Sequence, residues 1–177
     1  MINPQELLTV VDEHDNPLTP LPRKEVHAKG LWHRTAGIWV VNTNGQILCQ
    51  KRSLKKDVHP GLWEAFFGGH VLSGVEYLDS AAREMEEELG IKIDKKNLHF
   101  YKTLKSDKSH KEIQGIFALV LDTDRTDFTF EKEEIDEIKW VSREEVEKVL
   151  LSDDPHWVHK WWDKEVIEWL KNLNQVS

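Results

Sequence analysis

Three glutamates that lie close together in the sequence are the strongest candidates for chemistry. Within the segment 83–88, Glu84, Glu87 and Glu88 stand at positions i, i+3 and i+4. On a helix this spacing brings them to one face, where like charges repel by roughly a few tenths of a kcal/mol. The pattern therefore makes physical sense if a divalent cation lies among them, and hard carboxylate oxygens favour Mg²⁺ or Mn²⁺ over zinc. The alternative is a solvated acidic helix face.

Glycines precede this acidic segment. The run Gly68-Gly69-His70, with Gly74 after it, predicts a backbone bend on the N-terminal side of the carboxylates. Glycine lets the main chain approach a ligand closely. We therefore expect the free carbonyl of Gly69 to be available as a further metal ligand.

A basic loop is the second candidate site. Lys51, Arg52, Lys55 and Lys56 lie together in a chain that has 24 basic and 32 acidic residues. Such a group suits diphosphate oxygens, and a guanidinium can bind them with two parallel hydrogen bonds. The alternative is a solvated basic loop.

Two histidines near these segments could also contact a ligand. His33 precedes a buried strand and His70 follows the glycine pair, and either could instead be structural. For His99, His110, His156 and His159 we expect a surface position.

The elements that must position these residues alternate between hairpins and single helices. We expect helices at residues 79–89, 142–150 and 163–173, and strands at 7–11, 35–41, 46–51, 63–71, 97–104, 112–121 and 135–141. Asp79 or Ser80 can cap the first helix, and Gly90 can end it in a left-handed conformation. Residues 17–22 hold three prolines and predict an extended or looped stretch. The order of elements indicates an α/β (α+β) domain with a mixed sheet.

Length and charge limit the class of protein. The 177 residues suit one domain, and 39% hydrophobic residues are too many for a disordered chain. The net charge of −8 weighs against a nucleic-acid partner. A single cysteine, Cys49, excludes an internal disulfide framework and fits a cytoplasmic protein. No segment predicts a signal peptide or a membrane span.

The segment from Gly69 to Ile91 resembles the Nudix box. The pattern is Gly, five residues, Glu, seven residues, Arg-Glu, an aliphatic, one residue, Glu-Glu, one residue, Gly and an aliphatic. The matching positions are Gly69, Arg83, Glu84, Met85, Glu87, Glu88, Gly90 and Ile91. The first Glu of the pattern is replaced by Val75; in the family that Glu mainly supports the box and its Arg. The resemblance implies a Nudix-type α/β/α sandwich with a mixed β-sheet in a single domain over residues 1–177, and Mg²⁺ or Mn²⁺ as cofactor.

Segments outside the box resemble one branch of this family, which includes type I isopentenyl-diphosphate isomerase and its hydrolase-like relatives. They are residues 27–36, residues 50–53, Lys56 and residues 60–63. The isomerase uses a catalytic Cys at the position of Gly68. Its metal site uses histidines that correspond roughly to His27, His33 and His70, and a Glu near Glu112.

The resemblance and the residues together predict metal-dependent hydrolysis of a diphosphate linkage in a nucleoside diphosphate derivative or a similar small diphosphate. The alternatives are an isopentenyl-diphosphate isomerase and a non-catalytic binding module. We expect the metal at Glu84, Glu87, Glu88 and Gly69, catalysis by Glu84, Glu87 and Glu112, and substrate binding by Lys51, Arg52, Lys56, His33 and His70. The general base stays open among Glu87, Glu112, Glu131, Glu133, Glu134 and Glu137. Exposed tryptophans among Trp157, Trp161 and Trp162 would favour a homodimer.

Overall fold

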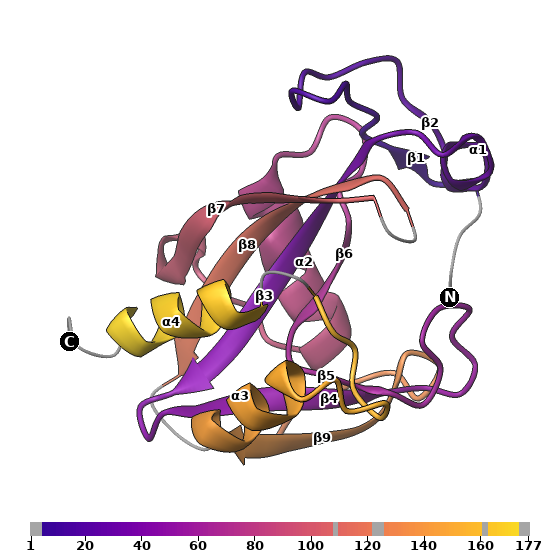
Figure 1. The fold of residues 1–177 in the computed structure, drawn as a ribbon. Helices are drawn as coiled ribbons and strands as arrows, with labels where there is room; N and C mark the ends of the chain where they lie inside the picture. Colours follow the sequence, from indigo (N-terminus) through magenta and orange to yellow (C-terminus); the bar gives the residue numbers. More distant parts are fainter. Residues whose placement is uncertain (1–4, 108–109, 122–125, 161–162, 174–177) are drawn as a thin grey trace.

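A mixed β-sheet forms the centre of the molecule (Figure 1). The computed structural model describes residues 5–107, 110–121, 126–160 and 163–173. The strands are β3 (His33–Asn42), β4 (Gln46–Arg52), β5 (Trp63–Glu64), β6 (Phe67–His70), β7 (Leu98–Ser106), β8 (Glu112–Leu121) and β9 (Ile135–Ser142). Their order is β5-β4-β3-β8-β7, with β6 paired to β3 and β9 paired to β4. The long central strands β3 and β8 run parallel, and their neighbours pair antiparallel.

Helices cover both faces of this sheet. Because side chains alternate along a strand, β3 sends Ile38 and Val40 into a core with α2 (Tyr77–Leu89) and Trp39 and Val41 into a core with the other helices. These are α3 (Arg143–Leu151) and α4 (Asp163–Leu173). The predicted α/β/α sandwich is therefore confirmed. None of the helices among the described residues is long and apolar enough to cross a bilayer.

Helix α2 carries the acidic segment and begins two residues earlier than the sequence predicts. Its N-cap is Glu76, whose side chain makes no capping hydrogen bond, so the prediction that Asp79 or Ser80 caps the helix is wrong. The first turn is held instead by Tyr77, whose hydroxyl donates to the carbonyl of Ile113 at 3.2 Å. The C-terminal end is as predicted, with Gly90 in the left-handed region at φ 67°. A tertiary contact that sequence spacing cannot reveal thus sets where α2 starts.

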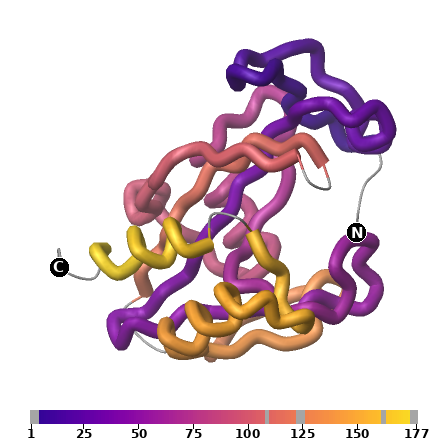
Figure 2. The backbone as a smooth tube through the Cα atoms, viewed as in Figure 1, coloured from indigo at the N-terminus to yellow at the C-terminus, as the bar shows by residue number. Residues whose placement is uncertain are grey.

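A short N-terminal helix was not predicted. Strand β1 (Leu7–Leu8) pairs with β2 (Leu21–Pro22), and α1 (Arg23–Lys29) follows directly. The prolines indicate an extended segment, but Pro22 is the residue that precedes α1. Figure 2 shows this N-terminal segment at the end of the sheet where β7 ends and β8 begins. A 3₁₀ turn, η1 (Lys95–Asn97), precedes β7.

Candidate active site

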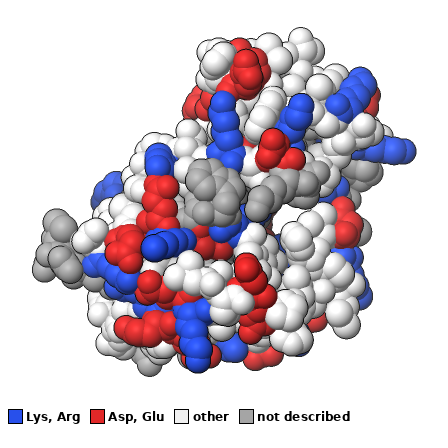
Figure 3. Space-filling model, viewed as in Figure 1, with Lys and Arg blue, Asp and Glu red and all other residues white. Residues whose placement is uncertain are grey.

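A cavity of about 560 Å³ opens at the end of the sheet next to α1 and α2. Among the described residues, nine carboxylates line it: Glu6, Asp57, Glu64, Glu84, Glu87, Glu88, Glu112, Glu131 and Glu134. Five cations of the described part of the chain line it as well: Arg23, Arg52, Lys56, Arg83 and Lys160. Acidic and basic side chains are likewise interspersed on the face of the molecule in Figure 3. Because the lining is acidic in balance, an anionic ligand would need added cations to bind there.

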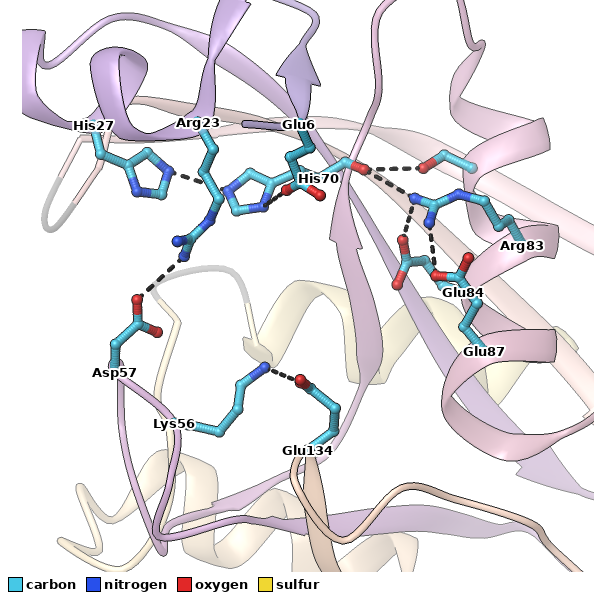
Figure 4. Close-up of polar contacts among 11 residues, drawn as sticks. Glu6, Arg23, His27, Lys56, Asp57, His70, Arg83, Glu84, Glu87 and Glu134 are labelled. Atoms are coloured by element: carbon cyan, nitrogen blue, oxygen red, sulfur yellow. Dashed lines mark hydrogen bonds and ion pairs between the residues drawn. The ribbon is translucent and has the colours of Figure 1, made fainter. Parts of the chain in front are cut away.

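The three glutamates of α2 line this cavity. Figure 4 shows two of them, Glu84 and Glu87, beside Arg83. The Arg83 guanidinium joins two of them, since its Nη2 lies 2.6 Å from a Glu84 carboxylate oxygen and its Nη1 lies 2.6 Å from Glu87. The same Nη2 donates to the carbonyl of His70 at 3.2 Å. Glu88 accepts a hydrogen bond of 2.8 Å from the backbone N–H of Gly68. The predicted helix face is thus assembled around Arg83 and strand β6.

Burial disfavours the charge on two of these carboxyl groups. Burial raises the pKa of Glu84 to about 7, although Arg83 beside it acts in the opposite direction. Burial also raises the pKa of Glu88 well above its ordinary value, and the neighbouring Glu84 adds to this. A divalent cation would supply the positive charge that these groups lack.

The glycines of β6 let the carboxylates come this close. A Cβ at Gly69 would lie 2.8 Å from a Glu84 carboxylate oxygen. Gly68 has φ 145°, and a Cβ there would lie 1.9 Å from the carbonyl oxygen of Ala36. Gly68 could not carry a side chain in this backbone, whereas a side chain at Gly69 would require the Glu84 carboxylate to move. The role of the Gly69 carbonyl as a metal ligand stays a prediction.

The structure brings part of the predicted phosphate-binding group to the cavity. Arg52 and Lys56 line it, whereas Lys51 is not among the lining residues. Arg52 forms an ion pair of 2.8 Å with Glu64. Lys56 forms a short ion pair with Glu134. A phosphate could reach these cations only by sharing or replacing their carboxylate partners.

Sequence reasoning missed two cations of the lining, Arg23 and Lys160, and three carboxylates, Glu6, Asp57 and Glu64. Arg23 of α1 points into the cavity and lies 3.3 Å from Asp57 of the basic loop (Figure 4). Glu6 lies beside it, with a carboxylate oxygen 3.8 Å from Nδ1 of His70. Both belong to the N-terminal segment, which carried no chemical motif. Only the fold of that segment against the sheet reveals them.

A histidine cluster, His27, His33 and His70, stands beside the carboxylates. Their candidate ligand atoms all lie within 4.8 Å of one another, and Nε2 of His27 lies 3.1 Å from Nε2 of His70. His33 is buried and its Nδ1 bonds the carbonyl of Leu31 at 3.0 Å, which leaves Nε2 without a partner among the described residues. A buried nitrogen with a free lone pair fits a metal ligand. A nitrogen-rich set of this kind suits borderline cations such as Zn²⁺ or Fe²⁺.

Burial keeps these imidazoles neutral. It lowers the pKa of His27 to about 4, with the neighbouring His110 and His33 acting in the same direction. Burial likewise lowers the pKa of His33 and lowers that of His70 well below its ordinary value. Neutral imidazole is the form that binds a metal.

The other glutamates and histidines considered from the sequence differ in whether they line the cavity. Glu112, Glu131 and Glu134 line the cavity, whereas Glu133 pairs with Lys55 at 2.5 Å and Glu137 lies in β9 opposite Lys51. His110, which we expected on the surface, also lines the cavity and stacks on His27 with ring centroids 4.1 Å apart.

Two other sequence features lie away from the cavity. Val75 is half-buried and packs against the core beneath α2. Trp157 is buried and stacks with Trp63. Trp161 and Trp162 lie outside the described residues.

Comparison with known proteins supports a common origin for this arrangement. The chain matches the NUDIX domain family over residues 31–170. It is 49% identical over 87 residues to a Nudix hydrolase of Pseudomonas aeruginosa, which covers 49% of this chain and 52% of that protein. It is 38% identical over 145 residues to a Nudix hydrolase of Yersinia pestis, covering 80% and 75%. An isopentenyl-diphosphate Delta-isomerase of Photorhabdus laumondii is 30% identical over 169 residues, covering 93% and 92%. The match thus spans only about half the length of the Pseudomonas relative.

Solved structures agree on the fold. A protein of Deinococcus radiodurans aligns with a TM-score of 0.69 at 21% identity, covering 93% of this chain and 99% of that one. The NUDIX domain of Shewanella oneidensis NrtR, solved with ADP-ribose, aligns with a TM-score of 0.57 at 12% identity, covering 79% and 86%. The box spacing, the sandwich and the match over residues 31–170 lead to one conclusion: the chain belongs to the Nudix family.

Proposed function

We propose that this protein is a metal-dependent hydrolase that cleaves a diphosphate linkage in a nucleoside diphosphate derivative or a similar small diphosphate. One observation carries the proposal. Glu84, Glu87 and Glu88 line one cavity together with Arg23, Arg52 and Lys56, and Arg83 joins Glu84 to Glu87. The carboxylates suit hard divalent cations and the cations suit phosphate oxygens, and one cavity holds both.

The metal would be held by Glu84, Glu87 and Glu88, with the carbonyl of Gly69 as a further donor. Mg²⁺ or Mn²⁺ bound there would offset phosphate charge and acidify water in the site. The raised pKa values of Glu84 and Glu88 support this assignment, because their burial is unfavourable for a charged carboxylate without a cation.

The side chains of the chain divide the remaining tasks. Arg52, Lys56 and Arg23 would bind the phosphate oxygens and stabilise the leaving group. Arg83 holds Glu84 and Glu87 in register and acts as a positioning residue. The general base that accepts the proton of the attacking water would be a glutamate that lines the cavity; Glu87 and Glu112 from the sequence argument meet this condition, as do Glu131 and Glu134.

Isomerisation of isopentenyl diphosphate is the second candidate, favoured by the histidine cluster and by the isomerase relative. The acid–base thiol of the isomerase would have to stand at position 68. Gly68 has φ 145° and a Cβ there would lie 1.9 Å from a carbonyl oxygen, so this backbone cannot carry a cysteine. Cys49 is buried in the core and burial raises its pKa far above the ordinary value. These observations favour hydrolysis.

The proposed partner is a small diphosphate, without nucleic acid. We also propose that the protein forms a homodimer and is located in the cytoplasm. The net charge of −8 and the acidic cavity lining support a small anion that binds together with metal cations.

A turnover assay tests the proposal. Purified protein with Mg²⁺ is given ADP-ribose, other nucleoside diphosphate derivatives esterified at both ends, and isopentenyl diphosphate. Phosphomonoester products of the nucleotides are detected by phosphate release with added alkaline phosphatase, whereas hydrolysis of isopentenyl diphosphate is followed by direct phosphate release without it. We expect hydrolysis of at least one, lost in Glu87→Gln and kept in Glu86→Gln, whose side chain is exposed on the same helix. Absence of turnover for every substrate, or full activity of Glu87→Gln, would overturn the mechanism. Proton exchange into isopentenyl diphosphate without hydrolysis would establish the isomerase instead.

A further inference from the structure

One buried hydroxyl in the cavity has no partner. Thr35 of β3 is 5% exposed, and its Oγ1 makes no hydrogen bond with any described residue. The residue nevertheless lines the cavity. A buried hydroxyl without a partner is destabilising, and a valine of nearly the same shape would avoid this loss. A threonine here therefore calls for a ligand that completes its hydrogen bonding.

The neighbours of Thr35 form a polar floor, defined as Thr35, Glu112 and Gln114. In the parallel pairing of β3 with β8, Thr35 stands opposite Gln114 and His33 stands opposite Glu112. Directly paired residues project from the same face of a sheet. Further along this face, Trp39 and Ile116 belong to the apolar core under α3 and α4. The polar floor is thus the point at which this face changes from core to cavity.

The chemistry of the polar floor differs from that of the cavity walls. A hydroxyl and an amide can each donate and accept a hydrogen bond, and a carboxylate accepts. A phosphate offers only acceptors, and the carboxylate of Glu112 would repel it. An isoprenoid tail offers no hydrogen bond to any of the three groups. An alcohol or sugar hydroxyl can both donate to Glu112 and accept from Thr35 or Gln114.

We propose that the polar floor binds hydroxyl groups of the organic moiety of the substrate, with Thr35 as a specificity-determining residue. This inference rests on the proposed hydrolase function and names the substrate class more narrowly. The phosphates then lie toward Arg23, Arg52 and Lys56, and the hydroxylated moiety lies over β3 and β8. A site that hydrogen-bonds a substrate hydroxyl discriminates strongly against analogues that lack it.

The test compares Thr35→Val, which removes the hydroxyl, with Thr35→Ser, which keeps it. With ADP-ribose as the hydroxylated substrate, we expect Thr35→Val to raise KM about tenfold with little change in kcat, and Thr35→Ser to stay within about threefold of the wild type. The thermal midpoint of Thr35→Val should equal or exceed that of the wild type. Isopentenyl diphosphate, which carries no hydroxyl, should show no change on the same substitution.

Thr9→Val is the matched control. Thr9 is also buried, but its hydroxyl donates to the carbonyl of Leu72 at 2.8 Å. We expect this variant to lower the thermal midpoint and to leave KM unchanged, which is the opposite pattern from Thr35→Val. A KM for ADP-ribose that stays within twofold in Thr35→Val would overturn the inference. Preference of the wild type for isopentenyl diphosphate would overturn it while leaving hydrolysis intact, whereas absence of all turnover would overturn the proposed function and the inference together.

Discussion

Two neighbouring clusters of potential metal ligands are connected through one residue, His70, and differ in ligand type and in the elements that supply them. The carboxylate cluster, Glu84, Glu87 and Glu88, comes from one helix, whereas the histidine cluster is assembled from α1, β3 and β6. His70 connects the two, since its ring belongs to the histidines and its carbonyl accepts from Arg83.

The pKa values of the two clusters respond to burial in opposite directions. Burial raises the pKa of Glu84 to about 7 and lowers that of His27 to about 4, so in each case the uncharged form is favoured. At neutral pH the imidazoles are therefore ready to bind a metal, whereas Glu84 and Glu88 must lose protons before they can do so. Burial thus leaves the histidine cluster neutral and suited to a borderline cation. The carboxylate cluster instead needs a hard cation that stabilises its negative charge.

Substitution in the carboxylate cluster should have the largest effect on activity. Glu88→Gln should lower kcat by about 10³-fold, because a metal ligand is lost where transition-state charge develops. A glutamine oxygen can still accept from the N–H of Gly68, so the fold should remain. Turnover at saturating Mg²⁺ and the thermal midpoint are the two measurements. Retained activity in a variant with an unchanged thermal midpoint would contradict a direct role of Glu88 in catalysis.

Gly68, whose backbone N–H donates to Glu88, should be important for the stability of the fold. Gly68→Ala should lower the free energy of unfolding by about 3 kcal/mol or more, because the new Cβ would meet the Ala36 carbonyl at 1.9 Å. Gly74 also has a positive φ of 77° but has no atom within 4 Å of its Cβ position. Gly74→Ala should therefore lower it by only about 1 kcal/mol. Urea denaturation of both variants measures the difference, and equal losses would show that close packing at β6 is unimportant.

Substitution of a residue in the histidine cluster should weaken the binding of a metal ion. His33→Gln removes the buried Nε2 and should weaken binding of Zn²⁺ by about 100-fold, since changes even beyond the direct ligands have effects of this order. Competition with a chromophoric chelator measures the affinity. His99→Gln, at an exposed position of β7, is the control and should bind as the wild type does. If both variants bind Zn²⁺ equally, the histidines are structural.

The same contrast explains what the sequence could reveal. The ligands of the carboxylate cluster lie within five residues, so helical spacing alone predicted their common face. The element order predicted a mixed-sheet α/β (α+β) domain, and the family resemblance added the α/β/α sandwich. The histidine cluster depends on α1, which the prolines at 17–22 concealed, and was indicated only by family resemblance. Arg23, Glu6 and His110 reach the cavity through tertiary packing. In the sequence Thr35 is an ordinary strand residue. It is distinguished only by its buried Oγ1, which makes no hydrogen bond with any described residue.

Asp163 is a test of whether burial alone can raise the pKa of a carboxyl group in this protein, as it does for Glu84 and Glu88. It is a buried carboxyl at the start of α4, it is not among the residues that line the cavity, and burial raises its pKa from 3.8 to about 7. The folded protein therefore holds this proton more tightly than the unfolded chain, so stability falls as pH rises between these two values.

Asp163→Asn should remove this contribution while keeping an acceptor for the N–H of Lys160, which lies 2.7 Å from the carboxylate. One proton over a window of about 1.5 pH units corresponds to about 2 kcal/mol. Between pH 5 and pH 6.5, in the presence of EDTA, the wild type should lose about 2 kcal/mol more stability than the variant. The pH dependence of stability that remains in the variant would then arise from the other titrating groups, which include Glu84 and Glu88. Identical slopes would mean that burial at α4 does not shift Asp163, and would weaken the same argument for the carboxylates of α2.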